Sequence, residues 1–204
     1  MTSEAKAIIL AGGDSQRMGS DKANLLLGEQ TLLKCVIATM QQVFPYVIVS
    51  VRQPRPEIDL PQVCDDQPKE GIPMGSGPLA GMVTSMDHVT TPWAFVVACD
   101  MPFILPGMIE LLGKYRDQYQ VVVPVVNGHP QTLAAFYASS CLATIRSHLT
   151  SGGKNSLRAV FDKLKVRYVN GMELLEVDAS LRSFFDLDTP QDFANATGRF
   201  KDVN

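Results

Sequence analysis

Short apolar runs alternate along the chain with segments in which apolar residues recur every three or four positions. The apolar runs predict strands at 5–10, 46–51, 93–98, 120–126, 131–137 and 165–169. The longer spacing is typical of helices that bury one face, and it occurs at 32–43, 79–86 and 108–115. Strands that alternate with helices in this way predict an α/β fold with three layers, in which a mostly parallel sheet is covered on both faces.

Length, charge and cysteine usage narrow the class of protein. The 204 residues fit one domain, and 46% hydrophobic residues suffice for a core. A net charge of −3 argues against nucleic-acid and anionic-membrane partners, because both require a basic face. The sequence has neither a secretory signal nor an apolar run long enough to span a bilayer. Its four scattered cysteines form no C-x-x-C pair, so we expect a soluble, cytoplasmic protein.

A glycine-rich, basic loop over residues 10–22 follows the first predicted strand. Gly12 and Gly13 carry no side chains, so consecutive backbone N–H groups can point at phosphate oxygens while Arg17 and Lys22 supply countercharge. The loop has the glycine spacing of neither a Walker A motif nor a dinucleotide fingerprint. A plain turn with two solvated cations is the alternative, but the other motifs of the chain favour a site for a nucleoside triphosphate.

Asp100 follows the buried strand predicted at 93–98. Its carboxylate is therefore expected at the same edge of the sheet as the glycine-rich loop. Mg²⁺ typically takes one or two carboxylates together with substrate phosphates and water, so one aspartate at this edge can begin a magnesium site. The alternative is an aspartate that caps the turn at Met101 and Pro102.

The segment 53–78 is rich in proline and glycine, with only Val63 and Cys64 as a plausible short strand. Loops of this length inside a domain are usually functional or disordered. Because the segment leads into the start of a helix, we expect a long loop that orders over the nucleotide when it binds.

Ser50 and Asp66 lie at the predicted carboxyl ends of strands, where both could face a base. A carboxylate can accept hydrogen bonds from guanine N1–H and N2–H₂ together, and adenine offers no such pair of donors. Asp66 would therefore favour GTP, whereas a solvated loop aspartate is the alternative.

Two further stretches are candidates for binding a second substrate. Lys154 lies in a glycine-rich stretch, 151–158, which could bind a phosphate at a helix start or be an ordinary loop. Asp186 and Asp188 face the same side if their segment is extended, so they could contact a metal or substrate. The competing interpretation is a helix start with Thr189 as its N-cap.

Five stretches of the sequence resemble, in their order and separation, motifs of the molybdenum cofactor guanylyltransferase family. They are Leu10–Lys22, Gly77–Gly81, Cys99–Phe103, His129–Pro130 and Asp186–Asp192. The resemblance implies a single Rossmann-like domain over 1–204, of the nucleotide-diphospho-sugar transferase type. About 1–104 would bind the nucleotide and about 105–204 the acceptor. Asp186 and Asp188 depart from the asparagines of relatives, which bears on the identity of the acceptor.

The resemblance also implies an activity and a set of site residues. The activity is Mg²⁺-dependent transfer of GMP from GTP to the terminal phosphate of Mo-molybdopterin, with release of pyrophosphate. The implied catalytic residues are Arg17, Lys22 and Asp100, the last also as the metal ligand. The implied nucleotide contacts are Leu10, Ala11, Gly12, Gly13, Lys22, Ser50, Asp66, Gly77, Pro78, Leu79 and Asp100. The implied acceptor contacts are His129, Lys154, Asp186 and Asp188.

The sequence contains no arrangement typical of an activated nucleophile, and this transfer needs none. A phosphate monoester has a second pKa of about 6, so at neutral pH it is already a nucleophilic dianion. Positioning and charge neutralisation then carry the catalysis. The alternatives are transfer from CTP to molybdopterin, a nucleotidyltransferase for a sugar phosphate, and a non-catalytic nucleotide-binding module. We expect a monomer whose further partners are proteins of molybdoenzyme maturation.

Overall fold

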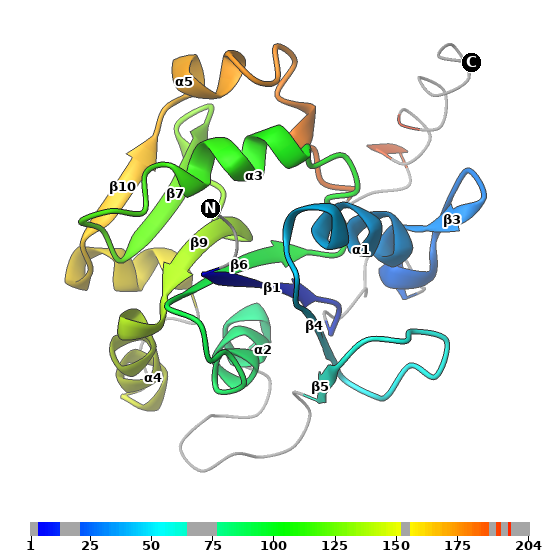
Figure 1. Ribbon diagram of the computed structural model, residues 1–204, viewed down its shortest axis with the longest axis horizontal. Helices are drawn as coiled ribbons and strands as arrows, with labels where there is room; N and C mark the ends of the chain where they lie inside the picture. The colour runs from blue at the N-terminus through cyan, green and yellow to red at the C-terminus, as the bar shows by residue number, and fades with distance from the viewer. Residues whose placement is uncertain are drawn as a thin grey trace.

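The computed structural model describes residues 4–12, 21–64, 77–151, 156–187, 191–192 and 196. Its large sheet is built from β1 (Ala5–Leu10), β4 (Val47–Val51), β5 (Gln62–Cys64), β6 (Trp93–Ala98), β7 (Val121–Val126), β8 (His129–Pro130), β9 (Ala134–Ala138) and β10 (Val166–Val169). The order across this sheet is β10-β7-β9-β6-β1-β4-β5, with β8 paired to β7 (Figure 1). A separate small hairpin joins β2 (Leu26–Leu27) to β3 (Gln30–Thr31).

The sheet is mostly parallel, as the alternation of strands and helices predicts. β1 runs parallel to β4 and to β6, and the pairs β4–β5 and β7–β10 are also parallel. β9 is the exception, because it runs antiparallel to both of its neighbours, β6 and β7. All the other strands on the path from β10 to β5 therefore end at the same edge of the sheet.

The predicted strand at 131–137 is wrong in its boundaries. The chain turns back after β7 through Asn127 and Gly128, which both have positive φ, at 50° and 75°. Such a two-residue turn matches the twist of a hairpin, so β8 pairs with β7 before the chain reaches β9 at Ala134.

Helices cover both faces of the sheet. They are α1 (Leu32–Val43), α2 (Gly77–Met86), α3 (Pro106–Gly113), α4 (Leu142–Thr150) and α5 (Gly171–Leu175). Single-turn or short 3-10 segments are η1 (Lys22–Asn24), η2 (Ser139–Cys141), η3 (Leu157–Lys163) and η4 (Arg182–Phe184). α1 and α3 lie on one face, and α2 and α4 on the other (Figure 1). No helix in these parts of the chain is long and apolar enough to cross a membrane.

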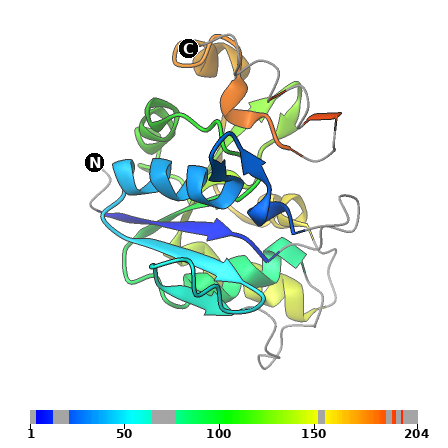
Figure 2. The same cartoon turned by 90° about the vertical axis from the view of Figure 1, so that its right-hand side faces the viewer.

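The alternation of side chains along β1 divides the core into two layers. Ile9 packs on the α1 and α3 side with Leu33 and Phe95, whereas Ile8 packs on the α2 and α4 side with Met82. The two layers lie above and below the strands in the second view (Figure 2). Because both faces of the central strands are buried, these strands are continuously apolar in sequence.

The short strand expected at Val63 and Cys64 within the long loop 53–78 is confirmed as part of β5. β5 pairs with β4 from Val49 and Gln62 to Val51 and Cys64, so this part of the segment extends the sheet. Residues 65–76 lie outside the described residues, and ordering of the segment over a nucleotide remains a prediction. The α2 helix begins at Gly77, with Pro78 in its first turn as expected for a residue without an N–H.

Candidate functional site

A cavity opens at the carboxyl ends of β1 and β6. β1 lies between β4, which follows it in the sequence, and β6, which lies on its other side. The strand order reverses at β1, and open α/β sheets bind ligands where the strand order reverses. The residues that line the cavity are Leu10, Ala11, Gly12, Asp21, Lys22, Ala23, Gly77, Pro78, Gly81, Ala98, Cys99, Asp100 and Leu133. The structure thus brings together three of the stretches singled out in the sequence.

Lys22 and Asp100 form an ion pair at this cavity. The Lys22 Nζ donates to Asp100 Oδ2 over 3.1 Å, and the two side chains are 17% and 20% exposed. Lys22 is the first residue of η1, and Asp100 stands two residues beyond β6. A cation and a carboxylate held this closely suit a substrate that carries both phosphate groups and a bound metal ion.

The donor set suits Mg²⁺ in the form that accompanies a nucleotide. No three His, Cys, Asp or Glu side chains gather into a metal site within the described ranges. Asp100 would act as a carboxylate ligand, with phosphate oxygens and water completing the shell, and Mg²⁺ commonly accepts one or two carboxylates in this way. The first turn of α2 adds Gly77 and Pro78 to the cavity, and the positive end of a helix favours phosphate there.

Two of the expected nucleotide contacts do not open on the cavity. Ser50 is completely buried, and its backbone carbonyl accepts a hydrogen bond from the Ala11 N–H over 2.8 Å. Leu79 is 2% exposed and packs with Met82 in the core beneath β1. Both side chains are buried beside the elements that form the site, and their contact with the nucleotide remains a prediction.

The expected acceptor residues are placed only in part. The Leu187 N–H donates to the Asp100 carbonyl over 3.0 Å, which holds the neighbouring, exposed Asp186 beside the turn that carries Asp100. His129 is exposed in the hairpin with β7, and Leu133 from the following connection lines the cavity. Five further predicted site residues lie outside the described residues, namely Gly13, Arg17, Asp66, Lys154 and Asp188.

Sequence reasoning missed Asp21 and Arg55, which meet beside Lys22. Asp21 caps η1 and lines the cavity, and the Arg55 guanidinium contacts the Asp21 carboxylate from the loop between β4 and β5. Asp21 could have been found as the residue that precedes Lys22 in the glycine-rich loop. Nothing in the sequence around Arg55 marks it, because it lies among prolines in a segment predicted to be a loop.

Cys99 lines the cavity but does not have the properties of a nucleophile. Burial, and then the neighbouring Asp100 carboxylate, raise the pKa of the Cys99 thiol to about 12. The thiol is therefore protonated at neutral pH, and the thiolate is the reactive form of cysteine. The Cys99 thiol is therefore not assigned a part in the chemistry of the site.

Replacing Cys99 with alanine should change the turnover number by no more than about threefold, because the protonated thiol takes no part in the reaction. The matched control is Cys141→Ala, since Cys141 is also buried, has a pKa of about 12 and lies away from the cavity. Both variants are compared by steady-state kinetics and thermal melting. If the Cys99 variant loses much more turnover than the control although the two variants melt at the same temperature, the thiol participates in the reaction.

Comparison with known proteins identifies the family. The model of the MobA-like NTP transferase domain matches residues 7–168. The chain belongs to this family. It is 35% identical to a probable molybdenum cofactor guanylyltransferase of Chloroflexus aggregans, over 91% of the chain and 89% of that protein. It is 32% identical to a probable molybdenum cofactor guanylyltransferase of Pelotomaculum thermopropionicum, over 95% of the chain and 92% of that protein.

Solved structures agree with the fold of this family member. Molybdopterin-guanine dinucleotide biosynthesis protein A of Archaeoglobus fulgidus superposes with a TM-score of 0.82 and 23% identity, over 97% of the chain and 99% of that protein. A 2-C-methyl-D-erythritol 4-phosphate cytidylyltransferase of Thermus thermophilus superposes with a TM-score of 0.70 and 15% identity, over 95% of the chain and 98% of that protein. The expected fold of the nucleotide-diphospho-sugar transferase type is thus confirmed.

Proposed function

We propose that this nucleotidyltransferase transfers GMP from GTP to the terminal phosphate of Mo-molybdopterin and releases pyrophosphate. The observation that carries the proposal is the ion pair of Lys22 and Asp100, 3.1 Å apart at a cavity that Gly12 also lines. The names of the relatives support guanylyl transfer to the molybdenum cofactor. The sequence supports the same donor and acceptor through the five motifs in family order.

The residues of the cavity have complementary roles in this reaction. The backbone at Gly12 approaches the phosphates without a side chain in the way, and the Lys22 ammonium donates to the oxygens that gain charge as pyrophosphate leaves. Arg17, which lies outside the described residues, is proposed as the second cation. Asp100 would hold Mg²⁺, which when bound neutralises charge on the phosphate that is attacked.

The acceptor needs no general base from the protein. An oxygen of its phosphate dianion forms the new bond to the α-phosphorus of GTP, and the bond from that phosphorus to the pyrophosphate oxygen breaks. The chain's part is to bring the two phosphates together in line. Asp186, beside the Asp100 turn, and the exposed His129 are the described residues that we propose for the acceptor side. Lys154 and Asp188 are proposed for it from the sequence.

Measuring pyrophosphate release with each of the four ribonucleoside triphosphates, with and without Mo-molybdopterin, tests the activity directly. We expect release only when GTP, Mg²⁺ and the acceptor are all present. Release with CTP and the same acceptor would instead identify a cytidylyltransferase. Release with a sugar phosphate in place of the pterin would identify a different acceptor class, and no release with any acceptor would favour a nucleotide-binding module.

GTP with Mg²⁺ should stabilise the protein more than ATP, CTP or UTP, because the Asp66 carboxylate can accept from both guanine donors. A ligand at about 100 times its dissociation constant adds roughly 2.7 kcal/mol, which raises the melting temperature of a domain of this size by several degrees. Thermal melting with each nucleotide measures the difference. Equal shifts for GTP and CTP would contradict the guanine preference.

The same thermal melting measurement on Asp66→Ala tests whether this residue recognises guanine. The substitution should reduce the difference between GTP and ATP and spare triphosphate binding, since Gly12 and Lys22 remain. Asp59→Ala is the matched control, because Asp59 is an exposed aspartate of the neighbouring loop. If the GTP preference survives the loss of Asp66, the base is recognised by other groups.

We place this reaction in the cytoplasm. All four cysteines of the chain, Cys35, Cys64, Cys99 and Cys141, are free thiols in the structure. Unpaired cysteines support a reducing compartment.

A further inference from the structure

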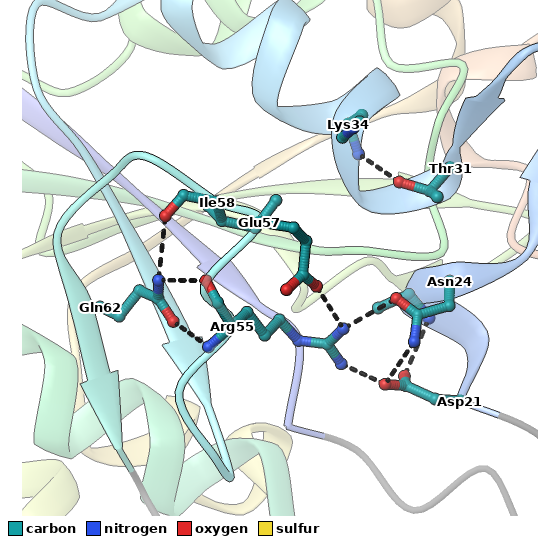
Figure 3. A network of polar contacts seen from close by, with 9 residues as sticks. Asp21, Asn24, Thr31, Lys34, Arg55, Glu57, Ile58 and Gln62 are labelled. Atoms are coloured by element: carbon teal, nitrogen blue, oxygen red, sulfur yellow. Dashed lines mark hydrogen bonds and ion pairs between the residues drawn. The ribbon is translucent and has the colours of Figure 1, made fainter.

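Arg55 connects the loop between β4 and β5 to the turn that carries Lys22. Its Nη2 contacts Asp21 Oδ2, and its Nη1 donates to Asn24 Oδ1 over 2.9 Å. Figure 3 shows the guanidinium reaching both ends of the turn at once. The Arg55 side chain is only 13% exposed. One planar group thus holds the first and last residues of the segment Asp21–Asn24.

The turn itself has little freedom around Lys22. The Asp21 carboxylate accepts from the Ala23 N–H over 3.1 Å, and the Asp21 carbonyl accepts from the Asn24 N–H over 3.0 Å. The Lys22 carbonyl accepts from the Leu25 N–H over 3.0 Å, and Ala23 is buried. Because the backbone is fixed on both sides of Lys22, the direction in which the lysine side chain leaves the turn is fixed as well.

Arg55 is in turn held by the sheet. The Gln62 side chain in β5 accepts from the Arg55 N–H over 2.8 Å and donates to the Arg55 carbonyl over 2.8 Å. It also donates to the Ile58 carbonyl over 3.0 Å, and the Glu57 carboxylate lies 3.7 Å from the Arg55 guanidinium. A rigid support of this kind lets a side chain hold a reactive group in place without a new cost in entropy at each turnover.

The contact with Asp21 also has an electrostatic consequence. Asp21 lines the cavity in which we place the phosphates, and an uncompensated carboxylate there would repel them. The Arg55 guanidinium offsets this charge from the side of the β4–β5 loop. The cavity can therefore contain an aspartate that shapes the turn and repels phosphate less than an unpaired carboxylate would.

We propose that Arg55 is a positioning residue for nucleotidyl transfer, which acts through Asp21 and the turn to hold the Lys22 ammonium opposite Asp100. The proposal rests on the function proposed above for Lys22. Lysine would not replace arginine, because a single ammonium cannot present two separate donors to Asp21 and Asn24 in the geometry of the guanidinium fork.

A double-mutant cycle between Arg55 and Lys22 tests this coupling. Arg55→Ala and Arg55→Lys are made in the wild-type protein and in a Lys22→Ala background, and kcat and KM for GTP are measured with Mo-molybdopterin as acceptor. The matched control is Arg146→Ala, which removes an ion pair with Asp87 of 2.5 Å that lies away from the cavity. Amide hydrogen exchange at Ala23, Asn24 and Leu25 is followed in the same variants.

Arg55→Ala should lower kcat by on the order of tenfold or more in the wild-type background, because misplacement of a positioned group by about 1 Å can cost a hundredfold. In the Lys22→Ala background the same change should lower kcat by less than about twofold, since no ammonium is left to position. The loss of countercharge at Asp21 should instead raise KM for GTP in both backgrounds. Arg55→Lys should restore kcat only in part. Exchange at the three amides should become faster with Arg55→Ala and stay unchanged with Arg146→Ala.

An equal loss of kcat in both backgrounds would overturn the proposal, because it would mean that Arg55 acts independently of Lys22. Unchanged kcat in the wild-type background would overturn it too. If Arg55→Ala does not fold, Arg55→Lys completes the cycle. If the wild-type protein transfers no GMP, the proposed function fails, and the exchange rates alone decide whether Arg55 holds the turn: faster exchange supports this, and unchanged exchange contradicts it.

Discussion

Lys22→Ala should lower the turnover number of nucleotidyl transfer by on the order of 10² to 10³, the usual cost of removing one preorganised donor. The Lys22 ammonium lies 3.1 Å from the Asp100 carboxylate and is largely shielded from solvent. It is therefore placed to meet the charge that develops on the departing phosphates. Steady-state kinetics with GTP and the acceptor measures the loss, which we expect mainly in kcat.

The control for this variant is Lys34→Ala. Lys34 is an exposed lysine in the first turn of α1, so its removal changes the net charge equally and leaves the cavity unaltered. Lys34→Ala should melt close to the wild type, since exposed charges contribute little to stability. Lys22→Ala should fold but melt below this control, because it leaves the mostly buried Asp100 carboxylate without its partner. If Lys22→Ala keeps more than about a third of the activity, the lysine is not the donor that stabilises the transition state.

Asp100→Asn should abolish Mg²⁺-dependent transfer, because an amide keeps the shape of the carboxylate and loses the charge that holds a hard cation. The fold should persist, since the contact between Asp100 and Leu187 is made by the Asp100 backbone carbonyl. Transfer assays over a Mg²⁺ titration measure the effect. Binding of Mn²⁺ in the presence of GTP provides a readout that does not depend on turnover. Chelation of the metal should abolish transfer by the wild-type protein.

Asp87→Asn is the matched control for Asp100. Asp87 is an ion-paired aspartate as well, with Arg146 as its partner, and it lies away from the cavity. We expect full activity from this control. If Asp100→Asn melts well below the wild type and its activity follows the folded fraction, Asp100 is a structural cap and the metal is held elsewhere.

Local patterns predicted the elements of the fold well, but not all of their partners. The apolar runs located β1 and β6 to the residue, because strands buried on both faces leave a continuous signal. The pairing of β8 with β7 and the reversed direction of β9 were not predicted. An apolar run carries no information on which way a strand points, since parallel and antiparallel neighbours bury the same side chains.

The site was predictable where one short motif carries several groups, and not where distant segments meet. Gly12 and Asp100 each stand two residues beyond a strand that ends at the cavity, so the strand predictions placed both at this edge of the sheet. Ser50 stood at a similar strand end, but its side chain is buried. Arg55 was invisible because its role depends on the contact of a loop with a turn more than thirty positions earlier. Such contacts are set by tertiary packing, which the local pattern does not encode.

The central position of β1 governs the order in which the chain can fold. Its partner β6 pairs from Ala5 and Trp93 to Leu10 and Ala98, so the middle of the sheet closes only after a long stretch of chain is available. Pairing between such distant segments is slow, because the chain between them loses conformational entropy before the stabilising contacts form. Until then the most apolar strands of the molecule have open edges.

The central strands also need the antiparallel strand β9, which lies in the second half of the chain. β9 covers the far edge of β6, so a fragment that ended near residue 104 would leave that edge unpaired. Unpaired apolar edges recruit other chains and lead to aggregation. We therefore expect that a fragment of residues 1–104 is not soluble when expressed alone. Substitutions around β9 should lower the yield of folded enzyme even where every nucleotide contact is intact.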